Sequence, residues 1–141
     1  MWAALIATFS TDAFSAEHTS RIIIPVLHWL FPTMAARTVF RIHHYIRKAA
    51  HVGEFFLLSL FLVRGIRAGQ QGWKVAWATT AVAIAAGWAA LDELHQAFVP
   101  SRGPSMRDVM IDITGAICGQ IAFAILIQLR GAFARQAEPS R

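Results

Sequence analysis

Ionisable side chains recur at helical spacing in this sequence. Arg47, His51 and Glu54 follow one another at steps of four and three residues, so that in a helix they share one face. A histidine beside carboxylates is the combination that acid–base chemistry uses. The candidate catalytic residues are His51, Glu54, Asp92 and Glu93. The alternative, which we favour, is an ion-pair network that holds helices in register.

Cations accompany these carboxylates. Arg47, Lys48 and Arg102 are suited to hold a phosphate, because arginine contacts it bidentately and lysine supplies a point charge. The alternative is that they anchor the chain to ordinary lipid headgroups. A metal site is a further alternative, since enough ligand types are present: His51, Glu54, Asp92, Glu93, His95 and Asp108. The neighbouring Arg and Lys disfavour a bare cation pocket, so we expect no metal and no cofactor.

The elements that carry these residues are apolar enough to cross a membrane. Of the 141 residues, 56% are hydrophobic and 15% charged, against roughly 25% charged in a soluble domain. Residues 75–91 contain no charged residue, and residues 109–129 contain only Asp112. Lipid-exposed backbone must satisfy its own hydrogen bonds, which predicts helices. We expect spans at about 49–66, 74–92 and 108–129.

These spans define the predicted architecture. We expect an all-α membrane protein, a small transmembrane helical bundle that forms one domain over residues 1–141. Residues 1–9 are apolar but too short to span, which predicts a partial or truncated first helix. Residues 16–31 contain Pro25 and are also too short, which predicts an interfacial or re-entrant helix.

The connectivity of three antiparallel spans brings the polar residues together. The helix that begins near Arg47, the end of the next helix at Asp92, and the start of the last at Asp108 fall on the same membrane face. Gly115 and Gly119 continue the face of Asp108 and Asp112 deeper into the membrane, where small residues allow close helix packing. Ionisable groups at that depth usually face the bundle interior.

The charge distribution suggests an orientation. The net charge is +5, but the basic residues flank apolar blocks, so nucleic-acid binding is not expected. The face opposite the polar residues carries a short basic turn with Arg64, Arg67 and Lys74. The positive-inside rule then predicts a cytoplasmic C-terminus and a polar cluster on the outer face.

Three motifs carry a resemblance to a known family. The first two run Arg47-Lys48-Ala-Ala-His51-Val-Gly-Glu54-Phe55 and Asp92-Glu93-Leu-His95-Gln96-Ala-Phe98-Val-Pro100-Ser-Arg102. The third is Asp108-Val109, then Asp112, Gly115 and Gly119. In this order, over Ile42 to Gly119, the sequence resembles the VanZ-like family of small bacterial membrane proteins. The family usually has Asn where this chain has Asp112, which leaves the role of that carboxylate open.

The resemblance implies a multi-pass protein of the bacterial inner membrane with a role in the cell envelope; the family is named after an accessory protein of glycopeptide (teicoplanin) resistance. Our hypothesis is a binding protein for an anionic, phosphate-bearing lipid, a polyprenyl phosphate or another cell-wall intermediate. Arg47 and Arg102 recur in the family pattern, which favours a role in the site. The predicted ligand-binding residues are Arg47, Lys48, His51, Glu54, Asp92, Glu93, His95, Gln96, Arg102, Asp108 and Asp112. The alternatives are an enzyme acting on such a lipid and a subunit of a proton-coupled transporter, which would require oligomers.

Overall fold

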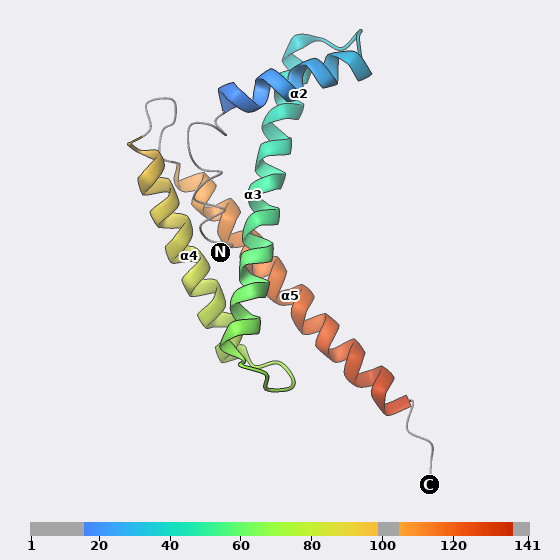
Figure 1. The fold of residues 1–141 in the computed structure, drawn as a ribbon, viewed down its shortest axis with the longest axis vertical. Coiled ribbons are helices and arrows are strands. Elements are labelled where there is room, and N and C mark those ends of the chain that lie inside the picture. Colours follow the sequence, from blue (N-terminus) through green and yellow to red (C-terminus); the bar gives the residue numbers. More distant parts are fainter. Residues whose placement is uncertain (1–15, 99–104, 137–141) are drawn as a thin grey trace.

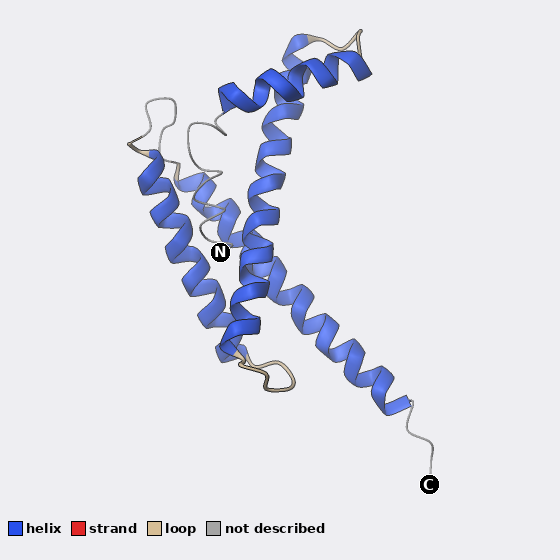
Figure 2. Ribbon diagram, in the orientation of Figure 1, coloured by secondary structure: helices blue, strands red, loops and turns tan. Residues whose placement is uncertain are grey.

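The computed structural model describes residues 16–98 and 105–136 of the chain. Every regular element in those ranges is a helix: α2 (Ala16–Leu30), α3 (Ala36–Ile66), α4 (Val75–Gln96) and α5 (Met106–Gln136). Figure 1 shows α3, α4 and α5 side by side, with α2 lying across the beginning of α3. Figure 2 shows short loops between α2 and α3 and between α3 and α4. The predicted all-α bundle is confirmed, whereas the predicted partial helix at residues 1–9 lies outside the described residues.

Three of these helices are long and apolar enough to cross a membrane: Ala36–Ile66, Val75–Gln96 and Met106–Phe133. They contain 31, 22 and 28 residues, and about 20 residues suffice to span the hydrocarbon core. Only 22–28% of the most apolar window in each helix is buried inside the bundle. Most of their apolar surface is therefore left for lipid, and the three predicted spans are confirmed.

The last helix is longer than the sequence suggested. We expected its span to end near residue 129, but α5 continues to Gln136. The residues after Arg130 include alanine, arginine and glutamine, which favour helices, and no proline occurs before position 139. Gly131 weakens the helix at that point, but the residues that follow let it continue.

The face of α4 that packs into the bundle changes character along its length. Its buried residues recur at steps of three and four, with Asp92 and Glu93 adjacent near its end: Ala78, Ala81, Ala85, Ala89, Asp92, Glu93 and Gln96. The alanines bring α4 close to Phe55 and Leu58 of α3 and to Ala116 of α5, which form the apolar core with Ala85 and Ala89. The same stripe thus carries carboxylates into the bundle at the end of α4.

The close approach of α3 and α5 depends on two glycines. A Cβ atom on Gly115 would collide with the backbone carbonyl oxygen of Val52. A Cβ atom on Gly119 would overlap the Ser59 hydroxyl and lie 2.7 Å from the carbonyl oxygen of Phe56. Small residues therefore let the two backbones touch, as the sequence predicted. Asp112 and Asp108 lie about one and two turns before Gly115 on α5. The close contact at the glycines therefore places both aspartates against α3.

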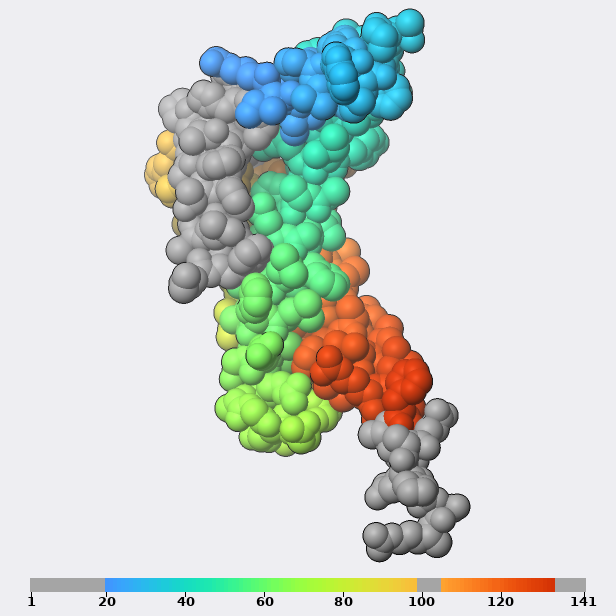
Figure 3. Space-filling model, turned by 45° about the vertical axis from the view of Figure 1, so that its right-hand side comes forward, coloured from blue at the N-terminus to red at the C-terminus, as the bar shows by residue number. Residues whose placement is uncertain are grey.

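α2 packs across the first turns of α3. Leu27 is buried there, while Ile22 and Trp29 are 71% and 80% exposed. Figure 3 shows α2 covering the beginning of α3 at one end of the molecule, and the second half of α5 at the other. The apolar side chains that α2 leaves uncovered are consistent with a helix in the membrane interface, and that placement remains a prediction.

Candidate functional site

An ion pair joins α3 to α5 at the rim of the bundle. The ammonium group of Lys48 contacts Asp108 Oδ1, sixty residues away in the sequence. The two side chains are 23% and 21% exposed, so the pair lies at the edge of the packed region. An ammonium has three N–H donors, and the pair with Asp108 uses one of them. Lys48 can therefore keep this contact and still donate to a ligand.

A second pair lies one helical turn deeper between the same helices. His51 Nδ1 is 3.4 Å from Asp112 Oδ1, and the two side chains are 18% and 1% exposed. The contact does not have hydrogen-bond geometry: among the described residues, His51 Nδ1 and both carboxylate oxygens of Asp112 find no hydrogen-bond partner. Buried polar atoms left in this way are costly, so a proton or a bound polar group would be strongly stabilised between them.

The end of α4 supplies a third set of polar groups. Asp92, Glu93 and Gln96 are 6%, 5% and 6% exposed. The Gln96 side-chain amide donates to Asp92 Oδ2 at 2.8 Å, one turn away on the same helix. Glu93 Oε2 accepts a hydrogen bond from the backbone N–H of Ser105 at 2.7 Å. This last bond fastens the end of α4 to the start of α5.

Ser105 also begins α5. Its backbone carbonyl accepts the N–H of Asp108 at 2.9 Å, and its hydroxyl lies 3.4 Å from the same nitrogen. A serine at this position satisfies helix N–H groups that have no partner within the helix, and an aspartate in the first turn complements the helix dipole. Because Ser105 fixes the first residue of α5, it also fixes the positions of Asp108 and, one turn later, of Asp112 opposite α3.

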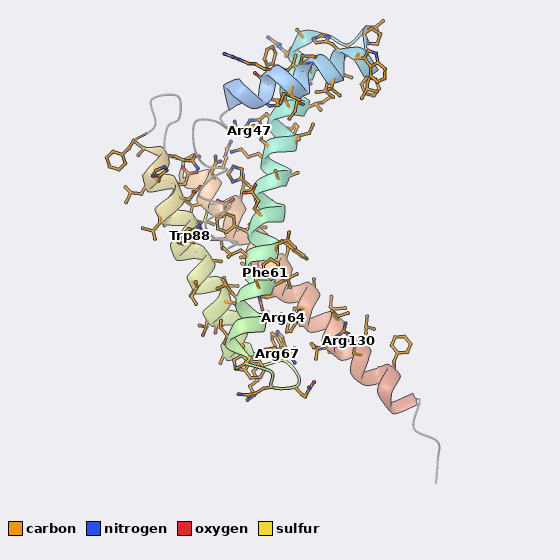
Figure 4. All side chains as sticks on the ribbon, viewed as in Figure 1. Arg47, Phe61, Arg64, Arg67, Trp88 and Arg130 are labelled. Carbon is orange, nitrogen blue, oxygen red and sulfur yellow. The ribbon has the colours of Figure 1, made fainter. Side chains whose placement is uncertain are left out.

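The structure unites most of the predicted residues but not all. Arg47 and Glu54 are half-buried on the α3 stripe that includes His51. Figure 4 labels Arg47 on α3 near the level at which α4 ends and α5 begins. His95 is exposed on α4, away from the face that buries Asp92 and Glu93. Arg102 lies outside the described residues.

The sequence interpretation missed Arg107 and Ser105 as members of this region. Arg107 is exposed in the first turn of α5, next to Asp108. The signal was present, because Ser105-Met-Arg-Asp108 has the spacing of a helix N-terminus with a charge in its first turn. Within residues 16–98 and 105–136, no group of three or more histidines, cysteines or carboxylates could hold a metal ion.

A buried hydrogen bond from a side-chain amide joins α5 to α3, further into the bundle than the two pairs. The Gln120 side-chain amide donates to the backbone carbonyl of Ser59 at 2.9 Å. Ser59 in turn donates its hydroxyl hydrogen to the carbonyl of Phe56 at 3.0 Å. These contacts, with the glycines above them, hold the two helices in one register. The positions of Lys48 against Asp108 and His51 against Asp112 follow from that register.

The sequence of this chain matches a known protein family. The sequence profile of the VanZ/LLP1 family matches residues 1–127. This range includes every residue of the polar region, by which we mean Arg47, Lys48, His51, Glu54, Asp92, Glu93, Gln96, Ser105, Arg107, Asp108 and Asp112. No curated protein sequence and no solved structure shows significant similarity to the chain. The match covers most of the 141 residues. It agrees with the resemblance to the VanZ-like family that the three motifs between Ile42 and Gly119 indicated. This multi-pass membrane protein belongs to the VanZ/LLP1 family.

Proposed function

We propose that this protein binds the phosphate group of a membrane lipid or lipid-linked envelope intermediate at the end of the bundle where α4 ends and α5 begins. One observation carries the proposal: the contact between Lys48 and Asp108 brings their sequence neighbours Arg47 and Arg107 to the same level of the bundle. Cations from two helices therefore gather at one rim. Arg102, in the segment between α4 and α5, is expected to join them.

The distribution of the opposite charges supports an anionic ligand. The carboxylates of Asp92, Glu93 and Asp112 are buried, and that of Asp108 already contacts Lys48. The cationic side chains are half-buried or exposed. Glu54 is half-buried like Arg47 but lies about two turns deeper along α3. A phosphate that approaches from the bilayer surface thus meets guanidinium and ammonium groups before it meets these carboxylates. Arginine is well suited to that role because it contacts phosphate oxygens in pairs.

Native mass spectrometry in a gentle detergent tests the proposal. The parent protein is expected to retain a polyprenyl phosphate and to release the corresponding polyprenol, which has the same chain without the charge. Arg47→Ala and Arg107→Ala should each raise the apparent Kd about tenfold, since a charge-assisted hydrogen bond contributes roughly that much. Arg41→Ala is the matched control, because Arg41 is an exposed cation on α3 outside the polar region. Equal retention of polyprenyl phosphate and polyprenol would contradict the proposal. So would a loss of affinity in Arg41→Ala as large as that in Arg47→Ala and Arg107→Ala.

The pair of His51 and Asp112 favours a second candidate, an enzyme that acts on such a lipid by acid–base chemistry. A histidine and a carboxylate 3.4 Å apart and shielded from solvent can hold and transfer a proton. Asp112→Asn preserves the shape of the side chain and removes its proton-binding carboxylate. Under the enzyme hypothesis this variant binds the lipid with unchanged Kd and loses turnover. Unchanged turnover of a phosphate-bearing lipid in Asp112→Asn would exclude this role for the pair.

A further inference from the structure

A second group of cations lies at the opposite end of the bundle. A cavity of about 460 Å³ opens there between the end of α3, the turn that follows it, and the second half of α5. Its walls include the side chains of Arg64, Arg67 and Arg130. Figure 4 labels these three arginines at the end of the molecule away from Arg47. We call this cavity the basic pocket.

The turn after α3 is folded so that it closes one side of the basic pocket. α3 ends at Ile66, and the chain reverses through Ala68 and Gly69, whose φ angles are 46° and 83°. Such left-handed backbone favours glycine and commonly terminates helices. Arg67 holds the turn by donating its Nε–H to the carbonyl of Gln70 at 2.7 Å. Its guanidinium carbon lies 5.6 Å from the ring centre of Phe123, which fastens the turn to α5.

Among the described residues, no carboxylate lines the basic pocket. The sequence contains no Asp or Glu from residue 55 to residue 91 or from residue 113 to residue 137. Arg64 stands in the last turn of α3, where a cation offsets the negative end of the helix dipole. Arg67 contacts the Gln70 carbonyl and the Phe123 ring, neither of which carries a full negative charge. The positive charge of the pocket therefore calls for an anion from outside the described chain.

The rest of the lining is apolar. Phe123, Leu126 and Ile127 of α5 form one wall, and Leu126 remains 44% exposed. They precede Arg130 by about one to two helical turns toward the membrane interior. A ligand that matches this order has a charged head among the arginines and a hydrocarbon chain against α5. A phospholipid has that order of groups, whereas a free phosphate ion would leave the apolar wall without a partner.

We propose that the basic pocket binds the headgroup phosphate of a membrane phospholipid, with one acyl chain along Phe123, Leu126 and Ile127. The guanidinium groups of Arg64, Arg67 and Arg130 are its phosphate ligands. This site is separate from the polar region at the other end of the bundle and does not depend on the function proposed there. It would fix the second half of α5, which Figure 1 shows diverging from α3 and α4.

Native mass spectrometry with three additives tests this inference: phosphatidylglycerol, diacylglycerol with the same acyl chains, and inorganic phosphate. One phosphatidylglycerol is expected to stay bound to the parent protein, and the other two are expected to dissociate. The double variant Arg64→Ala/Arg130→Ala should raise the apparent Kd for phosphatidylglycerol about tenfold or more. Arg130→Lys keeps a point charge and should therefore raise the apparent Kd for phosphatidylglycerol by a smaller factor. Circular dichroism checks that each variant keeps its helix content.

Lys74→Ala is the matched control, because Lys74 lies at the same end of the bundle with its ammonium 4.6 Å from the ring centre of Trp77, outside the pocket lining. If Lys74→Ala retains phosphatidylglycerol as well as the parent protein does, this supports a defined pocket. A loss in Lys74→Ala as large as in the double variant would show general attraction of anions and overturn the inference. Binding of inorganic phosphate with the same Kd as phosphatidylglycerol, or equal retention of diacylglycerol, would also overturn it.

Discussion

His51 of α3 and Asp112 of α5 face each other across a helix contact with 3.4 Å between Nδ1 and Oδ1, and Asp112 is fully buried. Each lies on a helix long and apolar enough to cross the membrane. The carboxylate sits directly above Gly115, where the two backbones touch. This desolvated ionisable pair is therefore part of the contact that holds α3 and α5 together.

The energetic role of this pair can be measured with a double-mutant cycle. His51→Ala is expected to destabilise the protein by about 3–5 kcal/mol, because it leaves the buried carboxylate of Asp112 without the imidazole that faces it. In an Asp112→Asn background the same substitution should cost much less, since no buried charge remains. Thermal unfolding in detergent gives both values. A cost that is the same in both backgrounds would show that the two residues do not interact.

The glycine contact predicts a clear contrast between similar substitutions. Gly115→Ala is expected to destabilise the fold by about 1–3 kcal/mol, because the added methyl group meets the carbonyl oxygen of Val52 and the helices must separate. Gly87→Ala is the control, since a Cβ atom there would have no other atom within 4 Å. That control should be neutral or stabilising by up to about 1 kcal/mol, as alanine favours helices over glycine. Equal melting temperatures for the two variants would contradict the close approach.

The rim pair should matter more for binding than for stability. Lys48→Ala is expected to lower the free energy of unfolding by only about 0.2–1 kcal/mol, because both partners are partly solvated. If Lys48 also donates to a ligand phosphate, the same variant should raise the apparent Kd for polyprenyl phosphate several-fold. Asp108→Asn separates the two roles, because it weakens the ion pair and leaves the cation in place. Binding that is impaired by Asp108→Asn but unaffected by Lys48→Ala would argue against a ligand role for Lys48.

The orientation predicted from the basic turn can be tested by cysteine labelling in intact cells. Gln71 is exposed in the turn between α3 and α4, and Cys118 is the single native cysteine. In a Cys118→Ser background, Gln71→Cys is expected to react with a membrane-impermeant maleimide only after the cells are opened. Reaction in intact cells would place the basic turn outside and reverse the predicted topology.

Several features of this protein follow from its sequence because the bilayer leaves few alternatives. An apolar block of about 20 residues must satisfy its backbone hydrogen bonds internally, so α3, α4 and α5 could be predicted from composition alone. Their order along the chain then places the end of α4 beside the start of α5. The steps of three and four residues between Arg47, His51 and Glu54 predicted their common stripe, and the three motifs predicted the VanZ/LLP1 family that the profile match shows.

The choice of partners was decided only by the tertiary structure. Helical spacing tells which residues share a face, but the rotation and axial shift of α5 against α3 depend on where Gly115 and Gly119 meet Val52 and Phe56. That register pairs Lys48 with Asp108 and His51 with Asp112, and neither pair could be assigned from the sequence. The basic pocket likewise needed the structure, because Arg64 and Arg130 are far apart in sequence. A left-handed turn after α3 and the path of α5 bring them to one cavity.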